Sequence, residues 1–535
     1  MRKILIFTLT AVALAQAPIQ VTTRLVEITV VVRDKRGAVA DLSKSNFEIL
    51  DKGKPRKIAT FSVTRANDRV PRAPLPPNTF SNRLDRQRDS AVTATVLLMD
   101  GLNTAFKDQA AARQQLLTLL KSLDPASPIA IYALGNNLRI VHDFTEDPAR
   151  LTRALQNNRS TPSALLADSQ SATDSARVAT PPATSLGARS DPLLLMDQVF
   201  EPLRSYALDR RVAITVAAMN AIANRMAGVP GRKNLIWVSG AFPLTFGFDR
   251  SGLTGSIEHG SYLGLMNDAA AAIDHANVAV YPVDPRGLIG PNPARISRAS
   301  GSTLNLPPPD SGTGAREIAT MELLADWTGG RAFYNTNDLS GAVKQAMEDA
   351  EVIYSLGFYP EEKDLDGSYH EVKIKVDRKG AAAHYRKGYF ATPLPAITSQ
   401  TASPALRDAL LSPVDATAVG LTASLTPDAS QAGRMVLALV LDLPNLSLAA
   451  NSDHWNDVVH FAIAQEGANG AILDTFQNAV KIDVTDQNRE QLLHDGVVLK
   501  LGITPAAGLS QIRIAVMDQA TGNVGSLRFL PRAGP

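Results

Sequence analysis

The feature that most constrains the fold is a buried strand that ends in an acid, within residues 93–104. The apolar run Val96–Met99 fits a strand buried on both faces, as in the middle of a parallel sheet. Asp100 follows this run, and the Gly, Asn and Thr residues after it favour turns and helix caps. Leucines at helical spacing come next, at Leu116, Leu119, Leu120 and Leu123. This order predicts an open α/β sheet with a binding site at its carboxyl edge.

The region 91–352 alternates apolar strand patterns with helical patterns along its length. Asn234–Ser239 is a typical strand pattern, whereas apolar residues recur every three or four positions over about 206–227. Strands that alternate with helices predict a doubly wound, mostly parallel, Rossmann-like sheet. Residues 158–190 are rich in Ser, Ala, Thr and Pro, and we expect them to be a flexible insertion in this domain.

Strand-rich segments flank this region on both sides. Residues 20–63 and 353–391 are each too short to bury a stable core, so we expect them to form one β domain together. The stretches 64–90 and 392–404 lack periodicity and are predicted to be linkers. Residues 405–535 contain several runs of alternating apolar residues, which predict a C-terminal β-sandwich-like domain.

The first fifteen residues have the pattern of a secretory signal peptide. Arg2 and Lys3 precede the apolar run Ile4–Val12, and a small-residue cleavage pattern ends at Ala15. The alternative interpretation is a short buried helix. The pattern predicts cleavage near Ala15 and a secreted, periplasmic or other extracytoplasmic location.

Composition excludes several classes of function. Without Arg2 and Lys3 the formal charge of +2 falls to about zero, which gives no electrostatic reason to expect nucleic-acid binding. The chain has no cysteine, so disulfides, thiolate metal sites and a cysteine nucleophile are excluded. No segment after the signal peptide is long and apolar enough to predict a transmembrane helix.

Several motifs occur in the order found in one known family. They are Val26–Val30, Asp34–Gly37, Asn46–Ile49, Asp51–Pro55, Asp100–Thr104, Pro230–Asn234, Val280–Gly287 and Tyr385–Phe390. On these motifs the chain resembles the VWFA-related domain proteins exported by bacteria, which are similar to von Willebrand factor A (VWA) domains. The resemblance covers roughly residues 20–391. It implies a VWA-like fold and export, but no known activity.

The resemblance also implies a degenerate metal-ion-dependent adhesion site. VWA domains hold a divalent metal with Asp-x-Ser-x-Ser after the first strand, and here the triplet is Asp100, Leu102 and Thr104. They also place an acid after the fourth strand, where this chain has Ser239. Hard divalent cations prefer several oxygen ligands, including carboxylates. We therefore expect Mg²⁺ or Ca²⁺ to bind weakly or optionally, with Asp100 and Thr104 as the ligands.

Five residues at the predicted carboxyl edge are candidates for partner binding. They are Asp100, Asn103, Thr104, Ser239 and Asp284. Each also has a structural interpretation: an Asp or Asn after a strand commonly caps a helix or closes an Asx turn. Asp284 could compensate for a missing metal ligand, or it could cap the turn that contains Pro285 and Gly287.

Enzyme signatures are absent from the sequence. It contains no Gly-x-Ser-x-Gly elbow, phosphate-binding loop or His-Glu-x-x-His motif, and its eight histidines are scattered. We therefore expect a non-enzymatic, exported adhesion or interaction module that binds a protein partner through loops at the carboxyl edge. The alternatives are a structural spacer of the cell surface or matrix and, as a third hypothesis, a hydrolase with an unrecognised site. Oligomeric state is not predicted.

Overall fold

The computed structural model describes residues 25–65, 69–70, 75–84, 90–91, 93–122, 128–159, 161–166, 192–229, 231–241, 269–287, 313–336, 338–392, 397–451 and 453–530. The predicted signal peptide and most of the predicted insertion 158–190 lie outside these residues. None of the described helices combines the length and apolar character needed to cross a bilayer.

A five-stranded sheet forms the centre of the α/β unit, in the order β11-β10-β9-β12-β13. β9 pairs in parallel with β10 and β12, β12 pairs in parallel with β13, and only β11 is antiparallel, to β10. Every residue of β9, β12 and β13 is buried, as expected for strands covered on both faces. The bounds are β9 Ala94–Asp100, β10 Ile129–Leu134, β11 Leu138–Thr145, β12 Lys233–Val238 and β13 Val278–Val283.

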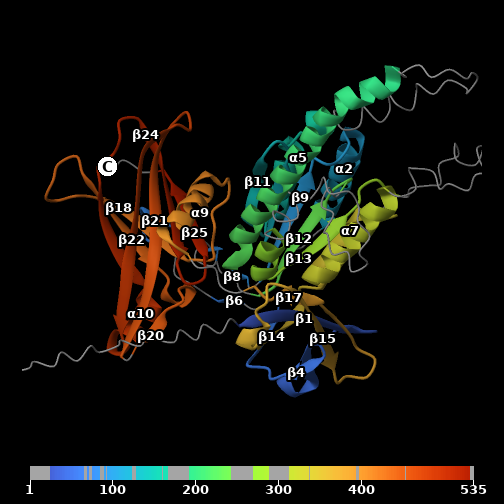
Figure 1. Cartoon of the computed structure of the whole chain (residues 1–535), viewed down its shortest axis with the longest axis horizontal. Coiled ribbons are helices and arrows are strands. Elements are labelled where there is room, and N and C mark those ends of the chain that lie inside the picture. Colours follow the sequence, from blue (N-terminus) through green and yellow to red (C-terminus); the bar gives the residue numbers. More distant parts are fainter. Residues whose placement is uncertain are drawn as a thin grey trace, which may run out of the picture.

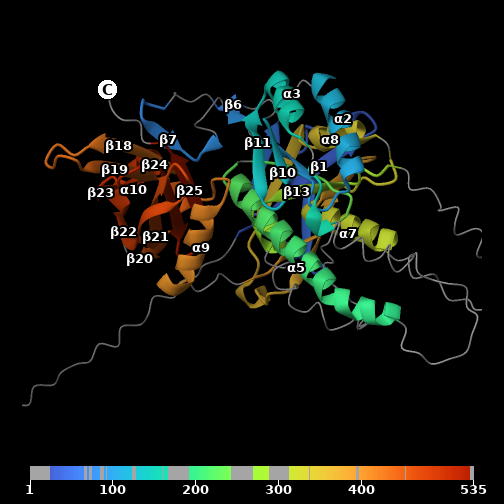
Figure 2. The same cartoon turned by 90° about the horizontal axis from the view of Figure 1, so that it is seen from above.

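Helices cover both faces of this sheet (Figure 2). One face packs on α2 (Phe106–Ser122), α3 (Pro148–Asn157) and α8 (Leu339–Glu348). The other face packs on α5 (Pro192–Ala227), on α7 (Thr313–Thr328) and on helical residues 269–275. Neighbouring residues of β9 point to opposite cores, because successive side chains of a strand alternate between its faces. The prediction of a mixed α/β chain is confirmed.

The segments before and after this unit share their sheets and their core (Figure 1). β1 (Val26–Asp34) pairs antiparallel with β14 (Val352–Phe358), and β3 (Phe47–Asp51) pairs with β15 (Tyr369–Val376). One apolar cluster contains Ile28 and Ile49 from the first segment and Tyr354 and Ile374 from the second. The shorter strands here are β2 Gly37–Ala38, β4 Lys54–Arg56, β5 Thr60–Arg65, β16 Ala382–Tyr385 and β17 Gly388–Phe390.

The C-terminal region contains two antiparallel sheets that share one apolar cluster. The first has the order β23-β19-β18-β7, and the second contains β20, β21, β22, β24 and β25. Their bounds are β7 Thr79–Ser81, β18 Leu421–Pro427, β19 Met435–Leu441, β20 Ala449–Asn451, β21 His454–Gly467, β22 Ile472–Thr485, β23 Val497–Ile503, β24 Leu509–Asp518 and β25 Val524–Phe529. Two helices accompany them, α9 Ser399–Leu411 and α10 Asp486–Asp495. β6 (Arg69–Val70) and β8 (Ser90–Ala91) form a two-stranded antiparallel sheet, and both strands precede β9 in the sequence.

The prediction that 64–90 is a linker is wrong over β7. Ser81 pairs with Thr422 of β18, and its Oγ donates to the Leu421 carbonyl at 2.7 Å. Phe80 packs on the C-terminal cluster and stacks on Phe529, with 4.7 Å between ring centroids. A strand of three residues is too short to produce a visible period, so only its distant partners identify it.

The prediction that 392–404 is a linker is wrong from Ser399 onward, where α9 begins. Thr398 caps the helix, and Ala402 and Leu406 are buried against the second C-terminal sheet. The Ser- and Thr-rich start and Pro404 inside the helix gave this segment the composition of a linker. Its stability comes from tertiary packing rather than from local propensity.

Candidate functional site

The turn after β9 is fixed against the neighbouring strand β10. The backbone N–H groups of Gly101 and Leu102 both donate to the Leu134 carbonyl, at 2.8 and 3.0 Å. The Asn103 N–H then donates to Asp100 Oδ1 at 2.9 Å, so the carboxylate accepts from the backbone three residues further along the turn. The predicted turn therefore forms, and it turns the Asp100 carboxylate back toward the sheet.

Asp100 is buried, and its second oxygen accepts three more hydrogen bonds. Oδ2 accepts from Asn103 Nδ2 at 2.9 Å, from Trp237 Nε1 at 3.0 Å and from Ser239 Oγ at 2.8 Å. Burial raises the pKa of Asp100, and these hydrogen bonds act in the opposite direction, with a net rise. All four donors are uncharged groups, so Asp100 is held by dipoles rather than by a direct ion pair.

The buried side chain of Arg211 is hydrogen-bonded to this network through Asn103. Asn103 Oδ1 accepts from Arg211 Nε of α5 at 2.9 Å, and Asn103 Nδ2 also donates to Thr215 Oγ1 at 3.1 Å. Arg211 is itself buried. Asn103 therefore connects the carboxylate of Asp100 with a guanidinium group through a single amide.

Thr104 and Ser239 join the ends of β9 and β12. Thr104 Oγ1 accepts from the Gly240 N–H at 2.8 Å, and the single hydroxyl proton of Ser239 is shared between Asp100 Oδ2 and the Ala241 carbonyl, which lies 2.7 Å from Ser239 Oγ. A Cβ at Gly240 would lie 3.3 Å from Thr104 Cγ2, so the strand ends approach closely. The structure therefore brings together four of the predicted residues: Asp100, Asn103, Thr104 and Ser239.

Asp284 has its partners within its own turn. Its carboxylate accepts from the Arg286 N–H at 2.9 Å and forms a bidentate pair with the Arg286 guanidinium, with the shortest contact at 2.8 Å. Arg286 neutralises this charge two residues further along the chain. The turn-capping interpretation of Asp284 describes the structure, and compensation for a missing metal ligand does not.

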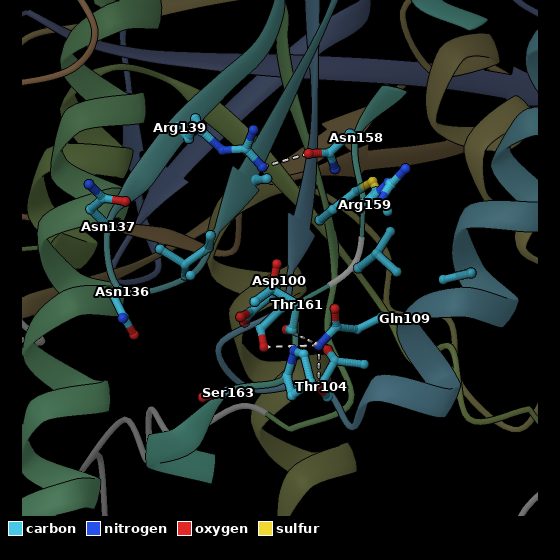
Figure 3. A pocket seen from close by; sticks show the side chains of 18 residues that line it. Asp100, Thr104, Gln109, Asn136, Asn137, Arg139, Asn158, Arg159, Thr161 and Ser163 are labelled. Carbon is cyan, nitrogen blue, oxygen red and sulfur yellow. Dashed lines mark hydrogen bonds between the residues drawn. The ribbon is translucent and has the colours of Figure 1, made fainter. Parts of the chain in front are cut away.

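A cavity of about 270 Å³ opens beside Asp100, between β9, the β10–β11 turn, the start of α2 and residues 158–159 and 161–163 (Figure 3). Gln109 Nε2 closes one side by donating to the carbonyls of Gly101 and Thr104 at 3.1 and 2.8 Å. The other polar side chains that line it are Asn136, Asn137, Arg139, Asn158, Arg159, Thr161 and Ser163. The cavity lies at the carboxyl edge of the sheet, where open α/β folds bind their ligands.

The donor set does not fit a divalent cation. Asp100 is the only carboxylate among the described residues that line the cavity, and both of its oxygens already accept hydrogen bonds. Mg²⁺ and Ca²⁺ require several oxygen ligands with free lone pairs. Among the residues that the structure describes, no group of three or more His, Cys, Asp or Glu side chains could hold a metal ion.

Sequence reasoning missed two groups of residues at this site. Trp237 and Arg211 complete the Asp100 network, and Arg139 and Arg159 line the cavity. A tryptophan in a fully buried strand gives a usable signal, because its indole N–H needs a buried acceptor. No local sequence pattern marks the arginines as site residues, because they come from separate segments that only the folded chain brings together.

No protein-family model matches the chain, and no curated protein matches it. Solved structures similar to parts of it include a von Willebrand factor type A protein from Catenulispora acidiphila, with 8% identity over 92% of this chain and 76% of that one and a TM-score of 0.25. An aerotolerance-related membrane protein from Bacteroides fragilis has 12% identity over 48% and 98% of the two chains and a TM-score of 0.22. BatB from Bacteroides thetaiotaomicron has 14% identity over 48% and 97%, with a TM-score of 0.21.

With TM-scores of 0.25 or less, these similarities do not establish the function or the shape of the whole chain. The strand order of the central sheet and the acid at the end of its middle strand are observations on this chain alone. The described strand order is that of an open, mostly parallel α/β sheet, and the motifs at 100–104, 230–234 and 280–287 resemble those of von Willebrand factor A domains.

Proposed function

We propose that this protein is an exported, non-enzymatic module that binds another protein at the carboxyl edge of its central sheet. In this proposal the doubly wound VWA-type sheet is the rigid scaffold, and the C-terminal β-sandwich is a separate domain. The single observation that carries the proposal is the polar cavity of about 270 Å³ beside Asp100. Binding residues are commonly placed on loops that a rigid sheet positions, as they are here.

The side chains around the cavity favour binding over proton transfer. General acid–base catalysis requires a titratable group that can reach the substrate. Asp100 instead accepts four hydrogen bonds from its own neighbours, and the described lining contains no histidine. Thr104 Oγ1 likewise accepts from the Gly240 N–H.

The size and rim of the cavity favour a segment of a protein as the ligand. Pockets for small organic ligands usually enclose roughly 300–1,000 Å³ with mostly apolar walls. Here Asn136, Asn137 and Thr161 are exposed at the rim. Their amide and hydroxyl groups can hydrogen-bond a peptide backbone that lies across the opening.

Binding can be tested by filling the cavity with a bulky side chain. Thr161→Trp introduces an indole at the rim, and Thr426→Trp introduces one at an exposed position on β18 as the matched control. Full-length chains carrying each change are immobilised and titrated with the extracytoplasmic protein fraction. We expect saturable capture by the wild type and by Thr426→Trp, and its loss in Thr161→Trp.

The competing functions predict different experimental results. Absence of any saturable partner for the wild type would favour the spacer hypothesis over binding. Turnover in a general hydrolase screen that Asp100→Ala abolishes would favour the enzyme hypothesis. Export is tested separately by N-terminal sequencing of the exported chain, which should begin near Gln16.

A further inference from the structure

We propose that the cavity receives a carboxylate group of an acidic peptide segment, held by the guanidinium groups of Arg159 and Arg139. This inference rests on the proposed function and names the chemistry of the partner.

The charges that line the described cavity are two arginines and Asp100. Figure 3 shows Arg139, Asn158 and Arg159 along one side and Asp100, Thr104 and Gln109 on another. Arg139 Nη2 donates to Asn158 Oδ1 at 2.5 Å, which holds its guanidinium beside the opening. Arg159 is exposed and has no hydrogen-bond partner among the described residues, so its donors are available to a ligand.

A carboxylate suits this arrangement for geometric reasons. The planar guanidinium fork matches the two oxygens of a carboxylate and forms short, charge-assisted hydrogen bonds with them. The cavity volume of about 270 Å³ equals that of about nine liquid waters, so an acidic side chain and part of its backbone can enter.

Asp100 selects against a more highly charged ligand. Its buried carboxylate lines the cavity wall and repels a second anion that approaches it. This repulsion grows with the charge of the ligand, so a phosphate carrying nearly two charges is less favoured than a carboxylate carrying one. The amides of Asn136 and Asn137 lie at the rim, where they can bond the peptide on either side of the acid.

The inference can be tested with defined peptides and the full chain. Fluorescence anisotropy measures the affinity for a labelled (Gly-Glu)4 octapeptide and for the matched, uncharged (Gly-Gln)4 peptide. We expect a Kd of about 1 mM or tighter for (Gly-Glu)4 and binding at least roughly tenfold weaker for (Gly-Gln)4. Affinity for the acidic peptide should fall as salt rises from 50 to 300 mM, because added ions screen the contact.

Three variants test the residues themselves. Arg159→Gln and Arg139→Gln should each weaken (Gly-Glu)4 binding roughly tenfold to a hundredfold, the loss expected for one charge-assisted contact. Arg153→Gln removes an exposed arginine of α3 that does not line the cavity, and should leave affinity unchanged. Acetate should displace the peptide at least as well as inorganic phosphate at equal ionic strength.

Several results would overturn the inference. These are equal affinity for the two peptides, no binding of (Gly-Glu)4, unchanged affinity in Arg159→Gln, or preferential displacement by phosphate. The proposed function can survive this failure. A partner that Thr161→Trp loses and Arg159→Gln retains would still bind at the cavity, but not through a carboxylate on Arg159.

Discussion

Asp100 accepts four hydrogen bonds from three residues, and none of the donor groups carries a charge. A buried carboxylate is costly unless hydrogen bonds replace the water it loses. Trp237 and Ser239 supply donors from the neighbouring strand, and Asn103 supplies two from the turn. Side chains of the turn and of the neighbouring strand end thus hold the buried acid in place.

Asp100→Asn should destabilise the folded chain by about 1–3 kcal/mol, because an amide group would then face at least one N–H or O–H donor. Chemical denaturation measures the change in the free energy of unfolding. Asp408→Asn, at an exposed position on α9, is the control and should stay within about 0.5 kcal/mol of the wild type. Equal stability of Asp100→Asn and wild type would mean that Asp100 is protonated in the folded chain, contrary to the donor pattern.

Metal binding should be weak in the wild type and stronger in Ser239→Asp. The Ser239 Oγ lies 2.8 Å from Asp100 Oδ2, so an aspartate there places two carboxylates side by side. Calorimetry of the wild type should detect no Mg²⁺ or Ca²⁺ affinity tighter than roughly micromolar. Ser239→Asp should be less stable without metal and should regain stability as metal is added. Tight binding by the wild type would contradict the assigned hydrogen bonds.

At the scale of residues, the sequence predicted the convergence of Asp100, Asn103, Thr104 and Ser239 because parallel strands end at the same edge. It could not assign Asp284, since a strand-end acid suits a ligand and a turn cap equally well. Arg286 decides that question in the structure. Arg139 and Arg159 reach the cavity through a hairpin and a loop, whose paths no local pattern specifies.

At the scale of elements, long periodic segments were predictable and short ones were not. β9 and β12 are continuous apolar runs, and covered parallel strands require such runs. β7 has three residues, and its partner β18 lies more than three hundred positions further along the chain. Its pairing depends on tertiary contacts rather than on propensity, which is why composition alone indicated a linker.

The pairing of β21 with β24 predicts a pH-dependent stability. Asp457 of β21 is buried near Asp518 at the end of β24, and its Oδ2 accepts no hydrogen bond from an N–H group of the described residues. Burial and the Asp518 carboxylate raise the pKa of Asp457 to about 8. This value exceeds the roughly 3.9 of an unfolded aspartate, so the contribution of Asp457 to stability is greatest below about pH 4 and is lost as pH rises toward 8.

Thermal unfolding of the wild type and of Asp457→Asn at pH 5 and pH 9 measures this effect. The wild type should lose more stability than the variant between the two pH values, because the amide does not ionise. Identical pH dependence of the two proteins would show that Asp457 does not titrate in this range.

At the scale of the whole molecule, the central α/β unit is inserted, in sequence, between the two segments that together form the β unit (Figure 1). Tyr354, from the later segment, donates to the Val39 carbonyl at 2.8 Å and accepts from the Leu42 N–H at 3.2 Å. Ile28 and Ile49 share its apolar cluster. Neither segment has a complete core without the other, so they should fold and unfold together.

Deleting residues 353–391 should therefore remove amide protection from β1 and β3 in hydrogen-exchange measurements. β1 loses its antiparallel partners β14 and β16, and β3 loses β15. The amides of β21 in the C-terminal region serve as the internal control and should keep their protection. Protected amides in β1 after the deletion would show that the first segment is stable alone.

The most direct test of the account is site-specific photo-crosslinking in living cells. A photoreactive amino acid replaces Asn136 at the cavity rim in one chain and Lys379, in an exposed turn of the β unit, in another. Binding at the carboxyl edge of the sheet predicts a defined covalent product with a second protein from position 136 and none from position 379. Products from position 379 but not from position 136, or no product from either, would contradict recognition at the carboxyl edge of the sheet.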